Sequence, residues 1–172
     1  MAIRIVSWLT DPPLRRRAAR VTRFGRVFEA VHSETTTASP AEIWELWENP
    51  ERWPEWNEQL ESGELEGAFA VGEKIRVKLC RGGRMQFEIT ELEPERLFVD
   101  ESRFPGARFG HEHRLEPTAD GCEITHRHYV SGFASGLWAM MLGRKRLRRA
   151  VAAFTEAERK LVETPDRRGK RR

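Results

Sequence analysis

The stretch GARFGHEHRLEPTADGCEITHRHYVSG, residues 106–132, contains two runs in which apolar and polar side chains alternate on either side of a turn signal. Alternation with a period of two is typical of strands, so this stretch predicts two long antiparallel strands joined by a tight turn. One face of the predicted pair, which we expect to point inward, carries Phe109, His111, His113 and Leu115 from the first strand and Cys122, Ile124, His126, His128 and Val130 from the second. Four of the five histidines of the chain therefore share that face.

The position of the turn sets the register of the two strands. A turn centred on Ala119 and Asp120 predicts three cross-strand pairs on the inward face, which are Leu115 with Ile124, His113 with His126, and His111 with His128. A purely apolar core does not favour four imidazoles, because each buried polar group without a partner costs about 2 kcal/mol or more. We therefore expect the inward face to meet a cavity.

Length and charge restrict the class of protein. A chain of 172 residues suits one domain that buries its core without disulfides or a structural metal. The formal net charge is +3, but a third of the residues are charged with nearly balanced signs, and the basic excess lies at the two ends. No recognition motif accompanies these basic ends, so we expect no specific nucleic-acid partner.

The cysteines and the apolar runs indicate where the protein resides. Cys80 and Cys122 are too few and too far apart for a zinc pattern or a redox CxxC motif, so we expect free thiols in a reducing cytoplasm. No apolar run approaches the roughly 20 residues of a membrane-spanning helix, so no transmembrane segment is expected. Arg4 interrupts the mildly apolar start of the chain, which argues against a signal peptide.

The chain is expected to divide into a basic N-terminal extension (1–26), one folded domain (27–163) and a basic disordered tail (164–172). A β-rich segment opens the domain, and Ser39, Pro40 and Glu42 then form a capping box that begins a helix. Asn49 and Pro50 are expected to end this helix and to cap a second short one. The tryptophans that follow, Trp53 and Trp56, are expected to cover one end of the core.

The central third of the sequence predicts further strands. The segments GEKIRVKLCR and RMQFEITEL alternate cleanly on either side of Gly82 and Gly83, which form the hairpin between them. The next segment, RLFVDESRF, has no clear alternation, so its register stays open between an inward set with Leu97 and Val99 and one with Phe98 and Phe104.

A helical period returns after residue 132 and predicts one long helix that ends before Pro165. Its apolar stripe comprises Trp138, Met141, Leu142, Ala150, Val151, Phe154, Ala157 and Leu161, and its opposite, solvated face carries Arg144, Lys145, Arg148 and Arg149. The predicted fold class is α+β, a curved antiparallel sheet of about seven strands around the long C-terminal helix, with two short helices after the first strand. A cavity is expected between sheet and helix.

Three segments carry a resemblance to a known superfamily: TTTASPAEIWELWENPERWPEWN, DESRFPGARFGHEHRLEPTADGCEITHRHYVSG, and the helix beginning SGLWAMMLGRK. Over residues 27–163 the chain resembles the START-like (SRPBCC) superfamily, in particular its bacterial polyketide cyclase/dehydrase-type members. The resemblance implies a helix-grip fold around a hydrophobic pocket. Similar proteins bind lipids, hormones or polyketides, and a minority catalyse cyclisation or dehydration, so fold alone does not fix the function.

The function predicted first is the binding of a small hydrophobic or amphipathic molecule, lipid or polyketide-like, in the cavity. The residues expected to contact it are Phe87, Glu101, Arg103, Phe109, His111, His113, Leu115, Ile124, His126, His128, Trp138 and Met141. In the alternative without a ligand, the histidines bond to each other and to Glu101 or Arg103 in a tightly packed core. The expected assembly is a monomer or a homodimer.

The alternative function is a cyclase or dehydratase-type enzyme in which His113 or His126 moves a proton. Imidazole suits this role because its pKa lies near neutrality and burial lowers it, which leaves a neutral base. A third hypothesis is a metal site built from the HxH pairs at 111/113 and 126/128. Their spacing and the flanking helices disagree with the cupin pattern that they superficially resemble, so the expectation is no metal and no cofactor.

Overall fold

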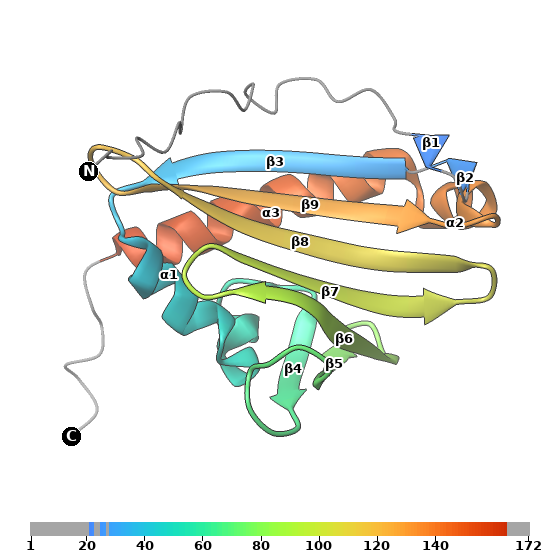
Figure 1. Cartoon of the computed structure of the whole chain (residues 1–172), viewed down its shortest axis with the longest axis horizontal. Coiled ribbons are helices and arrows are strands. Elements are labelled where there is room, and N and C mark those ends of the chain that lie inside the picture. The colour runs from blue at the N-terminus through green and yellow to red at the C-terminus, as the bar shows by residue number, and fades with distance from the viewer. Residues whose placement is uncertain (1–20, 23–24, 27, 165–172) are drawn as a thin grey trace, which may run out of the picture.

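The structure, a computed structural model, describes residues 21–22, 25–26 and 28–164, and its centre is an antiparallel sheet of seven strands (Figure 1). The elements in chain order are β1 (Val21–Thr22), β2 (Gly25–Arg26), β3 (Phe28–Thr36), α1 (Pro40–Trp47), the 3-10 helix η1 (Pro50–Glu55), β4 (Leu60–Leu65), β5 (Lys74–Leu79), β6 (Arg84–Glu93), β7 (Leu97–Phe104), β8 (Ala107–Pro117), β9 (Cys122–Ser131), α2 (Ser135–Leu142) and α3 (Arg144–Glu163). The predicted α+β helix-grip class is confirmed.

The strands lie in the order β3-β9-β8-β7-β6-β5-β4, so the first long strand pairs with the last one. Helix α3 lies across one face of this curved sheet, and α1 with η1 closes one end (Figure 1). Most of the predicted extension and tail falls outside the described residues. Within the extension, β1 pairs with β2 as a separate two-stranded sheet. No helix in the described part of the chain is both long enough and apolar enough to span a membrane.

The register predicted for the β8–β9 hairpin is confirmed. Leu115 pairs with Ile124, and the two histidine pairs, 113 with 126 and 111 with 128, follow along the strands. The inward faces of both strands are buried, except that His111 keeps partial exposure. Strand alternation and one short turn were therefore sufficient to align 11-residue and 10-residue strands.

The starts of α1 and η1 follow the sequence prediction, except that η1 lacks a side-chain cap. The Ser39 side chain accepts a hydrogen bond from the Glu42 backbone and the Glu42 side chain returns one, which is the expected capping box. Asn49 holds the predicted N-cap position of η1, but its side chain makes no cap hydrogen bond, and its amide donates to the Glu45 carbonyl at 2.6 Å instead. Trp53 and Trp56 are buried.

The long C-terminal helix is confirmed as α3, but it begins later than predicted, because the chain breaks at Gly143 and residues 135–142 form the separate helix α2. Gly143 has φ +77° and ψ 109°, a conformation that residues with a Cβ avoid, so the helix cannot continue through it. On α3, Val151 and Phe154 of the predicted stripe are buried, whereas Trp138 and Leu142 on α2 are only partly buried against the core. Met141 on α2 remains 65% exposed.

The structure also resolves the register of β7. Phe98 pairs with His113 and Asp100 pairs with His111, so Phe98 and Asp100 belong to the inward face. Leu97 and Val99 lie on the opposite face and are buried as well. This register places a carboxylate directly beside the histidines.

Candidate functional site

A cavity of about 300 Å³ lies between the inward face of the sheet and the helices. Its walls are mainly apolar and come from η1, β4, β5, β6, β8, α2 and α3, with Trp53, Leu60, Phe87, Phe109, Leu147 and Phe154 among them. Polar side chains gather at one place on the lining, where Asp100, His111, His113 and His128 meet. The cavity thus has an apolar body and one polar end.

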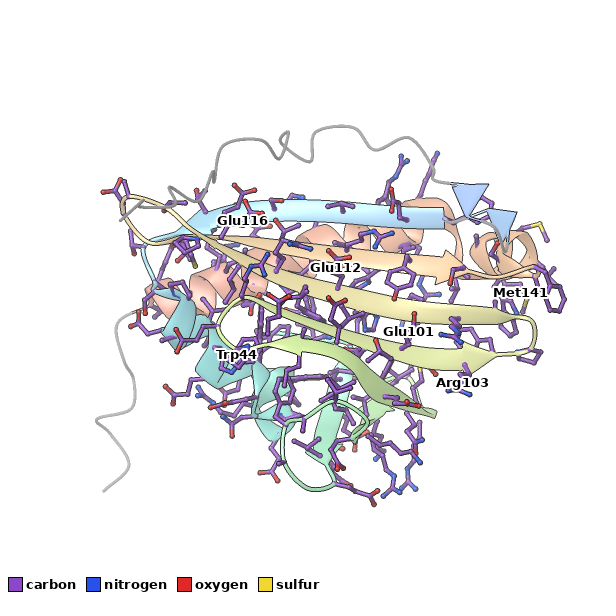
Figure 2. The ribbon with its side chains drawn as sticks, in the orientation of Figure 1. Trp44, Glu101, Arg103, Glu112, Glu116 and Met141 are labelled. Carbon is purple, nitrogen blue, oxygen red and sulfur yellow. The ribbon has the colours of Figure 1, made fainter. Side chains whose placement is uncertain are left out.

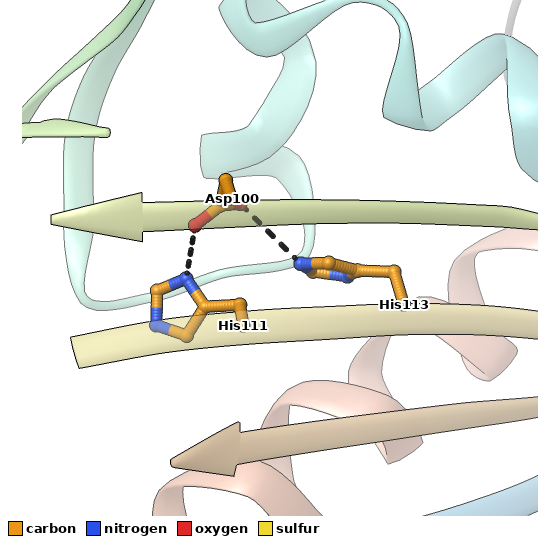
Figure 3. Close-up of side chains that lie close together, drawn as sticks. All are labelled: Asp100, His111 and His113. Atoms are coloured by element: carbon orange, nitrogen blue, oxygen red, sulfur yellow. Dashed lines mark hydrogen bonds and ion pairs between the residues drawn. The ribbon is translucent and has the colours of Figure 1, made fainter. Parts of the chain in front are cut away.

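Asp100 organises the polar end (Figure 3). Its side chain is 1% exposed, and its Oδ1 accepts a hydrogen bond from His111 Nδ1 at 2.9 Å. Its second oxygen, Oδ2, lies 3.6 Å from His113 Nε2. Nδ1 of His111 donates this hydrogen bond, so in the neutral form of the ring Nε2 is the acceptor. His111 is 18% exposed and is the most accessible side chain of the three.

The electrostatics favour a carboxylate beside neutral imidazoles. Burial by itself raises the pKa of Asp100, but the nearby His111 and His113 outweigh it and bring that pKa to about 2. Burial lowers the pKa of His113 to about 3, against the opposing influence of Asp100. Burial also lowers the pKa of His128 well below its usual value.

Ring packing holds these histidines in place. His113 stacks on Phe98 with ring centroids 4.0 Å apart and planes 5° apart. His111 lies 4.9 Å from Phe87 and 4.2 Å from His128, measured between ring centroids. Packed rings lose rotamer freedom on folding rather than on binding, so the polar end is preorganised.

His126 has a different environment, although it lies next to His113 on the sheet. Its Nε2 donates to Glu158 Oε2 at 2.6 Å, and Trp47 Nε1 donates to the other oxygen of the same carboxylate. All three side chains are completely buried. We call Trp47, His126 and Glu158 the buried triad; it joins α1, β9 and α3.

The predicted site residues separate into two groups. The cavity is lined by Phe87, Phe109, His111, His113, His128 and Met141. Outside its lining lie Glu101, Arg103, Leu115, Ile124, His126 and Trp138. Of these, Leu115 and Ile124 are buried in the core, and Trp138 stacks on Phe104 with ring centroids 4.6 Å apart. Contact between a ligand and the six predicted residues that line the cavity stays a prediction.

The expectation that Glu101 or Arg103 bonds to the histidines is wrong. Both side chains alternate with Asp100 and therefore lie on the opposite face of the sheet (Figure 2). Glu101 accepts a hydrogen bond from Tyr129 at 2.7 Å, and the side chain of Arg103 is 77% exposed. The histidine partner is Asp100, which sequence reasoning missed because the register of its strand was undecided.

A family model described as "Polyketide cyclase / dehydrase and lipid transport" matches residues 27–163. None of the curated proteins compared with the sequence matches it.

Several solved structures share the fold. Protein MLL2253 from Mesorhizobium loti has a TM-score of 0.64 at 19% identity, covering 81% of this chain and 99% of its own. Truncated norcoclaurine synthase from Thalictrum flavum has a TM-score of 0.64 at 17% identity, covering 81% and 96% respectively. The di-domain ARO/CYC StfQ from the steffimycin biosynthetic pathway has a TM-score of 0.60 at 17% identity, covering 79% of this chain and 49% of its own.

Proposed function

Because this chain belongs to the polyketide cyclase/dehydrase and lipid transport family, we propose that it binds a small apolar or amphipathic molecule in its cavity. The single observation that carries the proposal is the cavity itself, whose walls are apolar and whose polar groups gather at one end. Ligand pockets combine an apolar lining with a few placed polar groups in this way.

The polar end suggests which ligand chemistry suits the cavity. Its volume of about 300 Å³ lies at the lower end of the usual range for ligand sites. His111 offers a free acceptor nitrogen because Asp100 holds its proton on Nδ1. A lipid or polyketide-like ligand with a compact apolar body and one hydroxyl, phenol or enol donor therefore fits this end best.

A pair of matched substitutions on α3 tests the proposal. Ala150 lines the cavity, whereas Ala153 lies outside it on the exposed side of the same helix. Native mass spectrometry of freshly purified protein should detect a bound organic molecule in the unaltered chain and in Ala153→Phe, and should lose it in Ala150→Phe. Trp53 and Trp56 line the cavity, so ligand titrations can be followed by their fluorescence.

Two results would count against ligand binding. A clean mass without ligand, together with unchanged tryptophan fluorescence across a panel of lipids and aromatic metabolites, would support the alternative of a packed core. Equal binding by Ala150→Phe and the unaltered protein would place any ligand elsewhere.

The hydrogen bond between Asp100 and His111 favours a second candidate function, proton transfer in a cyclase or dehydratase-type reaction. A carboxylate that orients an imidazole leaves the other ring nitrogen ready to act as a general base. The role predicted for His113 stays a proposal because its ring also lines the cavity. The role predicted for His126 is not carried forward, since its Nε2 is already bonded to Glu158.

Replacement of His111 distinguishes a ligand carrier from an enzyme. With a polyketide-like substrate, His111→Gln should lower turnover by about 10²- to 10⁴-fold, the usual contribution of a positioned acid or base. Ligand affinity should change by only a few-fold. Unchanged turnover in this variant would rule out a proton-transfer role for His111.

We also propose that the protein acts in the cytoplasm, as a monomer or a homodimer and without a specific nucleic-acid partner. The free thiols of Cys80 and Cys122 support a reducing compartment. Light scattering on the purified protein checks the assembly, and titration with DNA and RNA at low salt checks the absence of nucleic-acid binding.

A further inference from the structure

We propose that Asp100, His111 and His113 together bind one divalent transition-metal ion at the polar end of the cavity (Figure 3). Each residue offers one ligand atom, and the three atoms lie within 4.8 Å of one another. Within the described ranges, no other group of three potential ligand side chains was found that meets this condition.

The distances suit coordination after a small movement. Zinc binds nitrogen and oxygen ligands at 2.0–2.2 Å in tetrahedral geometry, which separates the ligand atoms by about 3.4 Å. Asp100 Oδ1 and His111 Nδ1 are 2.9 Å apart, and Asp100 Oδ2 and His113 Nε2 are 3.6 Å apart. An ion between the three side chains would replace the His111–Asp100 hydrogen bond, and the proton of the neutral His111 ring would then sit on Nε2 while Nδ1 binds the ion.

Unpartnered buried atoms point to the same site independently. Asp100 Oδ2 and both ring nitrogens of His113 are buried without a hydrogen-bond partner among the described residues. Buried polar atoms in folded proteins are normally paired, and a group that lacks a partner calls for an explanation such as an ion. A cation bound between Asp100 and His113 would satisfy the carboxylate oxygen and one ring nitrogen.

The donor atoms also indicate which ion the site would hold. Two imidazoles and one carboxylate suit zinc and the neighbouring first-row ions better than magnesium or calcium, which prefer oxygen ligands. Three protein ligands leave at least one coordination position open, and all three residues line the cavity.

The site differs from the one considered from the sequence. In the sequence analysis, the candidate ligands were the HxH pairs at 111/113 and 126/128, and the expectation was that no metal binds. In the structure, Asp100 on β7 supplies a carboxylate, and His126 on β9 is hydrogen-bonded to Glu158. The ligands therefore come from β7 and β8 rather than from β8 and β9. The inference of a metal site does not rest on the proposed function. Binding of the ion and binding of the organic ligand are measured in separate experiments.

Metal titration of the full chain tests the inference. After treatment with a chelator, the protein should bind Zn²⁺ at one ion per chain by calorimetry, and Co²⁺ should produce visible absorption bands of a nitrogen- and oxygen-ligated ion. His111→Gln and Asp100→Asn should each weaken Zn²⁺ binding by more than about 100-fold, since even residues that only orient a ligand contribute about 10- to 100-fold.

The matched control is His32→Gln. His32 lies on the edge strand β3, outside the cavity lining. Its side chain is 35% exposed and pairs with Glu34 at 2.8 Å. Zn²⁺ affinity should be unchanged in this variant, and melting curves of the metal-free variants establish that each is folded. If Asp100→Asn does not fold, the Zn²⁺ affinity of His111→Gln alone decides whether the site exists, because the His111 side chain is partly exposed.

Three results would overturn the site. They are the absence of one-to-one binding, full Zn²⁺ affinity in His111→Gln, and a loss in His32→Gln as large as that in His111→Gln. None of them affects the organic-ligand experiment with Ala150→Phe, so failure of the metal site and failure of the proposed function can be told apart.

Discussion

Glu158→Ala should destabilise the protein more than any other single truncation of an acidic side chain on α3. Glu158 accepts hydrogen bonds from Trp47 and His126, and all three side chains are fully buried. Removing the carboxylate leaves two buried donors without an acceptor, at about 1–3 kcal/mol each. Breaking one side of a buried polar pair typically costs about 3–5 kcal/mol, so we expect a loss in that range.

Chemical denaturation at 25 °C measures this loss directly. For a chain of this length, each kcal/mol lowers the melting temperature by about 2–4 °C, so the expected decrease is about 6–20 °C. Glu156→Ala is the matched control, because Glu156 lies on the same helix, is exposed and forms an i, i+4 ion pair with Lys160 at the surface. Its free energy of unfolding should change by about 0.5 kcal/mol or less.

Glu158→Gln separates the hydrogen bonds from the packing. The amide keeps the shape and one acceptor oxygen, and its NH₂ group can face His126 if the imidazole proton moves to the other nitrogen. We expect this variant to lose about 1–2 kcal/mol, less than Glu158→Ala. A loss below about 1 kcal/mol for Glu158→Ala would refute the reasoning, because it would mean that neither donor depends on the carboxylate.

Three further outcomes follow from the local structure. A thiol reagent at neutral pH should modify exposed Cys80 and spare Cys122, because burial raises the pKa of the latter to about 11; labelling of both in the folded protein would contradict this. Gly143→Ala should cost about 1–3 kcal/mol, because φ is +77° at this position. Gly136→Ala, inside α2 with only an ordinary van der Waals contact near its new Cβ, should be neutral or stabilising. Equal melting temperatures for these two variants would contradict strain at Gly143. Ser39→Ala should cost about 1 kcal/mol through loss of the helix cap, measured by urea denaturation, and no loss would show that the capping box is dispensable.

The parts of the structure that the sequence predicted depend on short-range signals. The β8–β9 register required only clean alternation and one turn, and the start of α1 required only Ser39, Pro40 and Glu42. Those signals lie within a few residues of the feature that they determine. They were enough to place His111 and His113 together and to infer a cavity beside them.

The parts that sequence reasoning missed depend on context further along the chain. Leu97, Phe98 and Val99 are all apolar and all buried, so no alternation marked Asp100 as inward. Glu158 resembles a surface carboxylate on a charged helix. Its place four residues after Phe154, on the buried stripe, was the one available signal.

The break at Gly143 was missed for a different reason. A single glycine is tolerated inside helices, so the sequence alone does not separate an interrupted helix from a continuous one. The apolar residues on either side continued the same helical period across the break. The positive φ of Gly143, at which the helix is interrupted, becomes visible only in the structure.

The pairing of β3 with β9 has a consequence for how the protein is made. Ser33 and Thr125, whose hydroxyls are hydrogen-bonded at 2.8 Å, are 92 residues apart in the chain. During synthesis β3 emerges early and has no sheet partner until residues 122–131 leave the ribosome. Distant strand pairs form slowly because a long loop must close first. Chains that terminate before β9 therefore leave β3 and β8 without the strand between them, as two unpaired edges that invite aggregation.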